Sequence, residues 1–167
     1  MAVNMIQAIK SCLRQYVGFT GRACRSEFWY WILAIYLGRF VLYGLKTLFP
    51  VLGGTGLTLS AIFNILIFIP GLAVTVRRLH DIGRTGWWIV GFYIFLFFIL
   101  VLLAILGMSS FQTEPRETRF AVFILTLMGL MLFYAVILFI FLILDSQVGP
   151  NKYGSNPKGE GNFDIFS

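Results

Sequence analysis

Three polar segments between long apolar runs carry the residues that could do chemistry, at positions 16–29, 76–88 and 149–157. The middle segment, Val-Arg-Arg-Leu-His-Asp-Ile-Gly-Arg-Thr-Gly-Trp-Trp, is the densest, with the candidate residues Arg77, Arg78, His80, Asp81 and Arg84. Arginine forks bind carboxylates and phosphates through paired hydrogen bonds. The segment therefore predicts an ion-paired loop, a site for phosphate or an anionic headgroup, or a catalytic His–Asp pair.

The ion-paired loop is the favoured interpretation, with Asp81 paired to an arginine and His80 as a polar cap. Binding of an anionic headgroup is the second. Catalysis ranks last because the chain has a single histidine and no obvious nucleophile beside it. The sequence has no cluster of His, Cys and carboxylates with metal-ligand spacing, so we expect neither a metal nor another cofactor, and no enzyme.

The first polar segment repeats part of this pattern. Gly21-Arg22 and Gly83-Arg84 each precede an apolar run that opens with tryptophans, and glycine lets the chain turn sharply there. Arg22 and Arg25 therefore join the candidate lipid- or partner-binding residues. We expect Ser26 to cap the helix that follows and Asp145, in the tail, to pair with an arginine of the first two segments.

A second candidate site lies inside the membrane. Arg39 falls about eleven residues into the first apolar run, where an arginine costs about 2.5–3.5 kcal/mol on insertion scales. Asn64 of the second run should lie at a comparable depth in an antiparallel hairpin. The pair is either a functional polar pocket or a packing feature in which Arg39 reaches towards the outer interface.

Composition explains what must position these residues. Hydrophobic residues make up 59% of the 167 and charged residues 12%, about half the charged fraction of a soluble domain; mean hydropathy is +0.86. A helix needs about 20 apolar residues to cross a bilayer. Four continuous runs are that long: Phe28–Phe49, Leu57–Val76, Trp87–Gly107 and Phe120–Leu144. They predict an all-α integral membrane protein, a four-helix bundle.

The distribution of Lys and Arg predicts the orientation, because cytoplasmic loops are enriched in both. Nine of these residues lie before the first run, between runs two and three, and in the tail, against Arg116 and Arg119 in the 108–119 loop and none in the 51–56 turn. Both termini are therefore expected in the cytoplasm. The net charge of +6 follows from this topology, so no nucleic-acid partner is expected. The four tryptophans fit an aromatic belt.

The N-terminal segment has a separate pattern. Between residues 3 and 17, apolar residues recur every three or four positions, with Lys10 and Arg14 on another face. This is typical of an amphipathic helix in the membrane interface or of an ordinary helix packed on the bundle, and both interpretations stay open. Residues 1–27 then form a cytoplasmic segment, 28–144 the four-helix domain and 145–167 a turn-rich tail. Cys12 and Cys24 are expected as free thiols.

In this order, the three polar segments resemble the bacterial inner-membrane family called domain of unknown function 805. The resemblance covers nearly the whole chain, and residues 76–88 are its most specific part. It implies a small multi-pass protein of the inner membrane and implies no reaction.

Three functions remain after these arguments. The favoured one is a non-enzymatic interaction or lipid-associated module that uses a basic cytoplasmic face, with anionic lipid headgroups, a protein partner or a second copy as partners. The alternative is a small transporter or channel subunit with a polar pocket near Arg39 and Asn64. A membrane enzyme acting on lipid or phosphate substrates ranks third.

Overall fold

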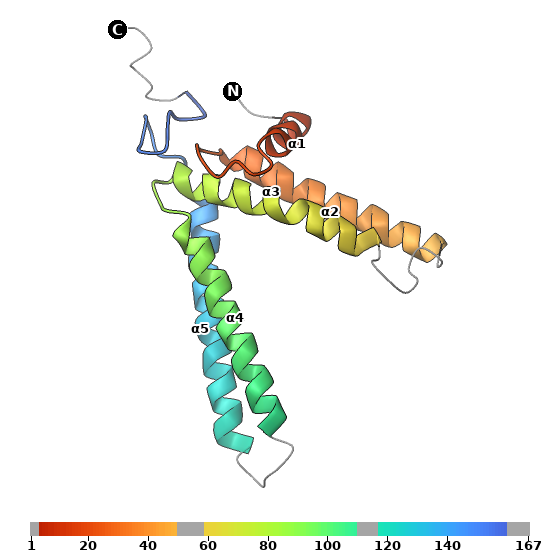
Figure 1. Cartoon of the computed structure of the whole chain (residues 1–167). Helices are drawn as coiled ribbons and strands as arrows, with labels where there is room; N and C mark the ends of the chain where they lie inside the picture. Colours follow the sequence, from red (N-terminus) through yellow and green to blue (C-terminus); the bar gives the residue numbers. More distant parts are fainter. Residues whose placement is uncertain (1–3, 50–58, 110–116, 160–167) are drawn as a thin grey trace. The chain divides into compact units, whose positions relative to one another are not determined.

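The computed structural model describes residues 4–49, 59–109 and 117–159, and this part of the chain is all-helical apart from turns. Its helices are α1 (Met5–Arg14), α2 (Arg25–Leu48), α3 (Leu59–Asp81), α4 (Trp87–Ser109) and α5 (Glu117–Ile143) (Figure 1). The last four are long and apolar enough to cross a membrane. The predicted all-α class with four membrane spans is therefore confirmed.

The chain divides into two compact units. The α2–α3 unit comprises α1, α2, α3 and the tail from Leu144, and the α4–α5 unit comprises residues 86–143. The turn at 51–56 and the middle of the 108–119 loop lie outside the described residues.

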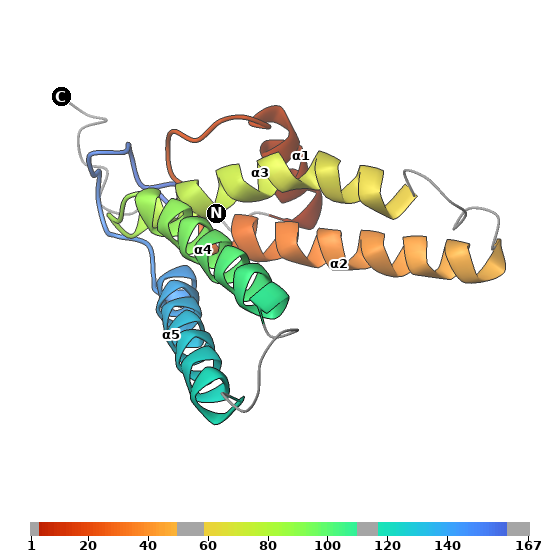
Figure 2. The same cartoon turned by 60° about the horizontal axis from the view of Figure 1, so that its bottom comes forward.

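The α2–α3 unit is an antiparallel hairpin with α1 lying against one end (Figures 1 and 2). Its buried apolar side chains gather where α2 begins and α3 ends, and they include Phe28, Trp31, Val74 and Leu79. We call this the motif end. Towards the other end the helices touch closely, since a Cβ at Gly38 would lie 2.7 Å from the Phe63 ring.

The end of α3 corrects the sequence analysis. The helix continues to Asp81, so Arg77, Arg78 and His80 lie on its last two turns and not in a loop. Gly83, with φ of 76°, then ends the helix in a Schellman motif: the Gly83 and Arg84 amides donate to the His80 and Leu79 carbonyls at 3.0 and 2.9 Å.

The start of α2 also differs from expectation. The N-cap is Cys24 and makes no side-chain capping bond, so the predicted Ser26 cap is wrong. Trp31 is 4% exposed, which removes it from the aromatic belt, whereas Trp29 and Trp87 are exposed. The buried Trp31 indole instead packs between the two helices, near Gly71 of α3.

Pro70 lies inside α3 and lacks the N–H that would bond the Leu66 carbonyl. The hydroxyl of Tyr16, which follows α1, donates to that carbonyl at 2.6 Å. The N-terminal segment therefore satisfies a backbone group that the proline leaves without its helical donor.

The α4–α5 unit is a hairpin held by apolar and aromatic packing. Ile99 and Leu138 are its buried side chains among those described. The Tyr134 hydroxyl donates to the Trp88 carbonyl at 2.8 Å, and its ring stacks on Trp88 and Phe92. Gly91 makes this approach feasible, since a Cβ there would lie 3.0 Å from the Tyr134 hydroxyl.

Candidate functional site

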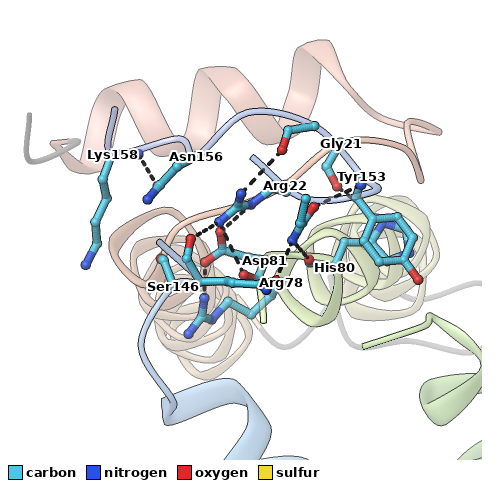
Figure 3. Close-up of polar contacts among 12 residues, drawn as sticks. Gly21, Arg22, Arg78, His80, Asp81, Ser146, Tyr153, Asn156 and Lys158 are labelled. Carbon is cyan, nitrogen blue, oxygen red and sulfur yellow. Dashed lines mark hydrogen bonds and ion pairs between the residues drawn. The ribbon is translucent and has the colours of Figure 1, made fainter. Parts of the chain in front are cut away.

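Arg22 is the centre of the polar cluster at the motif end (Figure 3). Its Nε donates to Asp81 Oδ1 at 3.0 Å. Its two terminal nitrogens donate to four backbone carbonyls, those of Gln147 at 2.6 Å, Gly149 at 2.7 Å, Gly154 at 3.3 Å and Asp81 at 3.4 Å. A guanidinium has five donors, so every one has an acceptor. Arg22 thus fastens the tail to the end of α3.

Asp81 carries the negative charge of this cluster. Its second oxygen, Oδ2, pairs with Arg78, whose guanidinium also donates to the Leu144 carbonyl. Both side chains have no exposed area. Two arginines therefore share one buried carboxylate, and both also donate to backbone carbonyls. We call Arg22, Arg78 and Asp81 the Asp81 cluster. It confirms the expected pairing of Asp81 with an arginine.

His80 borders the Asp81 cluster and belongs to its support. Its Nδ1 lies 3.2 Å from the Gly21 carbonyl, and its ring stacks on Tyr153 at 3.8 Å with 3° between the planes. Asn151 donates to the His80 carbonyl at 3.0 Å. The segment before α2 and the tail thus both contact the imidazole, and its contacts are those of a packing group.

A second cluster joins α1 to the hairpin. Glu27 Oε1 accepts the Ser11 hydroxyl at 2.8 Å and Arg77 Nη1 at 3.4 Å. The same Arg77 nitrogen donates to Gln15 Oε1 at 2.6 Å. We call Ser11, Cys12, Gln15, Glu27 and Arg77 the Glu27 cluster. It links the N-terminal segment with α2 and α3.

Two features of the Glu27 cluster follow from its burial. Arg77 is 1% exposed, and its Nε and Nη2 have no hydrogen-bond partner within the described residues. Cys12 is buried beside the Glu27 carboxylate, and burial first and the carboxylate second raise the pKa of its thiol to about 12. Cys12 therefore stays a neutral thiol at physiological pH, and both cysteines are free as predicted.

The predicted headgroup-binding residues thus separate into two groups. Arg22, Arg77, Arg78 and Asp81 are buried and bonded within the protein, so their side chains do not face a headgroup. Arg25 is partly exposed; it donates to the Leu144 carbonyl at 2.9 Å and pairs with Asp145 at 3.6 Å. The predicted contact of Asp145 with an arginine is therefore confirmed.

Arg84 is exposed and borders a shallow hollow of about 540 Å³. The hollow is lined by the end of α3 and the tail, through Ile82, Gly83, Arg84, Gln147, Pro150, Asn151 and Lys152. Arg84 and Lys152 are the charged groups of this lining, and both are positive.

Arg39 and Asn64 lie together, as their depth in the hairpin predicts. Arg39 Nη2 donates to Asn64 Oδ1 at 3.1 Å. Beside them is a groove of about 330 Å³ between α2 and α3, lined by Arg39, Leu42, Tyr43, Lys46, Ser60, Phe63 and Asn64. We call it the Arg39 groove. Sequence reasoning missed Lys46 and Ser60, although Lys46 follows Arg39 by seven residues and so shares its helix face.

Sequence reasoning also missed Ser11, Gln15 and Tyr16, which hold the N-terminal segment to the hairpin. Ser11 and Gln15 are four residues apart on one helix face, but nothing in the sequence names their partners. For Tyr16 one signal existed, since Pro70 predicts an unbonded carbonyl at Leu66.

Most of the chain is similar to a known protein family. Residues 16–155 match the family described as "Protein of unknown function (DUF805)", and the match covers the first two polar segments in full and residues 149–155 of the third. The chain belongs to the DUF805 family. The matched region starts at Tyr16, whose hydroxyl bonds the Leu66 carbonyl of α3. It ends at Ser155, after the tail carbonyls that accept hydrogen bonds from Arg22. The DUF805 match therefore covers α2, α3, the tail residues that Arg22 contacts and the α4–α5 unit, and it begins after α1.

Three Escherichia coli (strain K12) proteins are similar to this DUF805 member. Inner membrane protein YhaH is 40% identical over 110 residues, which are 65% of this chain and 88% of YhaH. Inner membrane protein YhaI is 38% identical over 112 residues, 64% of this chain and 92% of YhaI. The uncharacterized protein YiiR is 30% identical over 142 residues, 83% and 84% of the two chains. No solved structure is significantly similar to the chain. The protein is thus a multi-pass inner-membrane protein of a family without an assigned reaction.

Proposed function

We propose that this protein is a non-enzymatic, lipid-associated membrane module that uses α1 and its basic flank to bind the anionic surface of the cytoplasmic leaflet. The observation that carries this proposal is the outer surface of α1. Ala8 and Cys12 are completely buried and form the packing face. Ile6 and Leu13, seven residues apart, are 65% and 53% exposed.

A row of cations lies next to this apolar row. Lys10 and Arg14 are four residues apart on the helix and both are exposed. An interfacial helix places an apolar strip at the acyl boundary and cations among the headgroups, and the two rows of α1 supply both. Val17, 68% exposed, continues the apolar surface beyond the helix. The two interpretations of this segment are therefore compatible: one face packs on the hairpin while another is available to lipid.

The Glu27 cluster and the Tyr16 bond support the same function, because they hold α1 in a fixed orientation. A helix already folded on its hairpin loses less conformational entropy when it meets the membrane surface. An Asn4–Gln7 capping box also fixes the start of α1. Each cation near an anionic surface contributes about 1 kcal/mol, so Lys10 and Arg14 together favour anionic over neutral lipid.

The orientation with both termini in the cytoplasm is part of the proposal. It rests on the excess of Lys and Arg at the motif end and in the tail. The non-enzymatic assignment rests on the environment of His80 and Asp81. His80 contacts the Gly21 carbonyl and the Tyr153 ring, and Asp81 pairs with the two arginines of the Asp81 cluster.

Nitroxide labels placed on adjacent residues test the position of α1. In vesicles containing phosphatidylglycerol, a label on Leu13→Cys should collide more often with oxygen, which concentrates in the bilayer. A label on Arg14→Cys should collide more often with a water-soluble nickel chelate. Cys12 and Cys24 are buried, which limits background labelling. Equal, aqueous accessibility of the two labels would contradict the proposal.

Lipid retention measured by native mass spectrometry tests the cations. Replacing Lys10 and Arg14 with glutamine should reduce the number of phosphatidylglycerol molecules retained relative to phosphatidylethanolamine. The matched control is Lys152→Gln with Lys158→Gln, which removes two cations from the tail of the same unit. Equal losses in both double variants would show a general charge effect and overturn the assignment to α1.

The Arg39 groove favours a second candidate function, a transporter or channel subunit. Such a role needs a polar path, and the groove places Arg39, Ser60 and Asn64 around one space between α2 and α3. Flux of small anions into proteoliposomes, altered by Arg39→Ala, is the expected result. Absence of flux would leave the lipid-associated function as the better account.

A further inference from the structure

The Arg39 groove has an unbalanced set of charges. Arg39 and Lys46 line it from α2, Ser60 and Asn64 line it from α3, and no carboxylate is among the lining residues. The connecting residues 50–58 contain no Asp or Glu in the sequence. Two positive charges therefore face this groove, and no negative group among the described residues lines it to neutralise them.

Within the part of the chain that the structure describes, Arg39 has unused hydrogen-bonding capacity in the groove. Its Nη2 donates to Asn64 Oδ1, and a guanidinium has five donors in all. An amide oxygen carries no net charge, so this bond orients Arg39 without neutralising it. An intramembrane arginine is normally paired or faces a polar cavity; here the cavity is present, and its described lining contains no counter-charge.

The neighbouring groups are arranged for one acceptor-rich ligand. Lys46 lies two helical turns beyond Arg39 on the same face, about 10 Å along the axis at 1.5 Å per residue. Ser60 and Asn64 are four residues apart on α3 and add a hydroxyl and an amide. Leu42 and Phe63 supply apolar walls. The volume of about 330 Å³ is within the range of small-ligand sites, about 300–1,000 Å³.

We propose that the Arg39 groove binds an oxyanion of the phosphate type, with Arg39 and Lys46 as its ligands. Arginine binds phosphate through paired N–H donors, and Lys46 adds a second charge nearer the outer end of the hairpin. The proposal is independent of α1, because the groove lies at the opposite end of α2 from the motif end. It is also independent of transport, since it concerns binding alone.

The same chemistry has two sources, a phospholipid headgroup and a free anion. A headgroup would place its acyl chains along the exposed apolar surfaces of α2 and α3, where Phe40 and Ile62 are 76% and 38% exposed. A free anion would need only the polar lining. The experiment therefore has one arm for each source.

In the first arm, native mass spectrometry measures phosphatidylglycerol bound to the detergent-solubilised protein. In the second, equilibrium binding of radiolabelled inorganic phosphate is measured without lipid. Both arms compare the wild type with Arg39→Gln, with Lys46→Gln and with the double variant. The Lys152→Gln, Lys158→Gln double variant is the matched control, since it removes the same charge from the tail. Slow thiol labelling of Cys12 and Cys24 verifies that each variant is folded.

The double variant should lose about tenfold or more in affinity in at least one arm, since each replaced cation removes a charge-assisted hydrogen bond. Loss in the lipid arm alone identifies a headgroup site, and loss in the phosphate arm identifies a site open to free anions. The tail control should keep the wild-type binding in either arm. Folded groove variants with unchanged binding in both arms would overturn the proposal. This outcome does not depend on the result of the nitroxide-label experiment on α1.

Discussion

The two hairpins of this protein are held together in different ways. In the α2–α3 unit, arginines and carboxylates are buried at one end, and directional bonds join four separate segments: α1, the two hairpin helices and the tail. In the α4–α5 unit, α4 has no charged residue at all, and α5 has none between 120 and 143. Its described contacts are mainly apolar and aromatic.

The difference shows where specificity resides in a small membrane protein. Lipid tails are as apolar as leucine, so apolar packing alone gives two membrane helices little preference for one arrangement. Burying an ion pair costs desolvation free energy. Removing only one of the two partners is nevertheless strongly destabilising, because the other charge stays buried without a partner. The α2–α3 unit therefore has a defined arrangement at its motif end, while the α4–α5 unit depends on the fit of Tyr134 against Gly91.

The largest expected effect is at Asp81. Asp81→Ala would leave Arg22 and Arg78 buried without their shared carboxylate, which costs about 3–5 kcal/mol by analogy with other broken buried pairs. The melting temperature should fall steeply when unfolding is followed with a thiol-reactive dye, because Cys12 and Cys24 are buried in the same unit. Trypsin should also cut faster after Lys152 and Lys158 as the tail detaches.

Asp145→Ala is the matched control for that comparison. Asp145 pairs with Arg25 and Lys158, but its side chain is 65% exposed, and exposed pairs contribute little. A control as destabilised as Asp81→Ala would show that burial does not distinguish the two carboxylates.

Tyr16→Phe should have an intermediate effect and lower the free energy of unfolding by about 1–2 kcal/mol. The Leu66 carbonyl loses the hydrogen bond that it accepts from Tyr16, and no helical N–H is present to replace it. Pro70→Ala tests this reason directly, since alanine restores an N–H for Leu66. In a double-mutant cycle followed by the same dye assay, Tyr16→Phe should cost less in the Pro70→Ala background. Additive effects would mean that Tyr16 acts by packing alone.

A smaller effect is expected from Tyr134→Phe in the α4–α5 unit. Hydrogen bonds between membrane helices average about 0.6 kcal/mol, and the phenylalanine ring can keep its stacking on Trp88. Hydrogen exchange of the Trp88–Phe92 amides, measured by mass spectrometry, should rise only slightly. If exchange throughout α4 and α5 increased sharply, this unit would also depend on a polar fastening, and the contrast between the hairpins would fail.

The smallest effect is the pH dependence of Asp145. A hydrogen bond from Lys158, the Ser146 amide and the nearby Arg25 hold the pKa of its carboxyl below the ordinary value of 3.8. A lowered folded-state pKa favours the ionised form in the folded protein, so the contribution is present at neutral pH and is lost as pH falls through that pKa. In a plot of melting temperature against pH, Asp145→Asn should make the decrease on the acid side slightly less steep. An unchanged decrease on the acid side would mean that the pair contributes nothing measurable.

Much of the fold could be predicted from the sequence because membrane spans depend on local composition. The runs located all four membrane helices, and Pro70 and Gly83 marked positions with special backbone needs. The ends of the helices were less accurate. Residues 77–81 are polar enough to suggest a loop, but their charges are neutralised within the protein, so α3 extends through them.

The candidate sites were predictable in part. Arg39 and Asn64 could be paired because antiparallel helices of known length bring equal depths together. Arg22, Arg25 and Arg84 could not be distinguished, since each is an arginine near a glycine or a helix start. Their different burial depends on contacts with the tail, which begins 122 residues after Arg22 and 60 residues after Arg84.

By itself, the sequence determined that this chain spans the membrane four times as helices, because the length and apolarity of each run suffice for that. Tertiary structure alone decided which cations are neutralised internally and which remain exposed. The physical reason is that burial and ion pairing arise between distant segments: Arg22 takes its acceptors from α3 and the tail, whereas Lys10 and Arg14 remain exposed on α1.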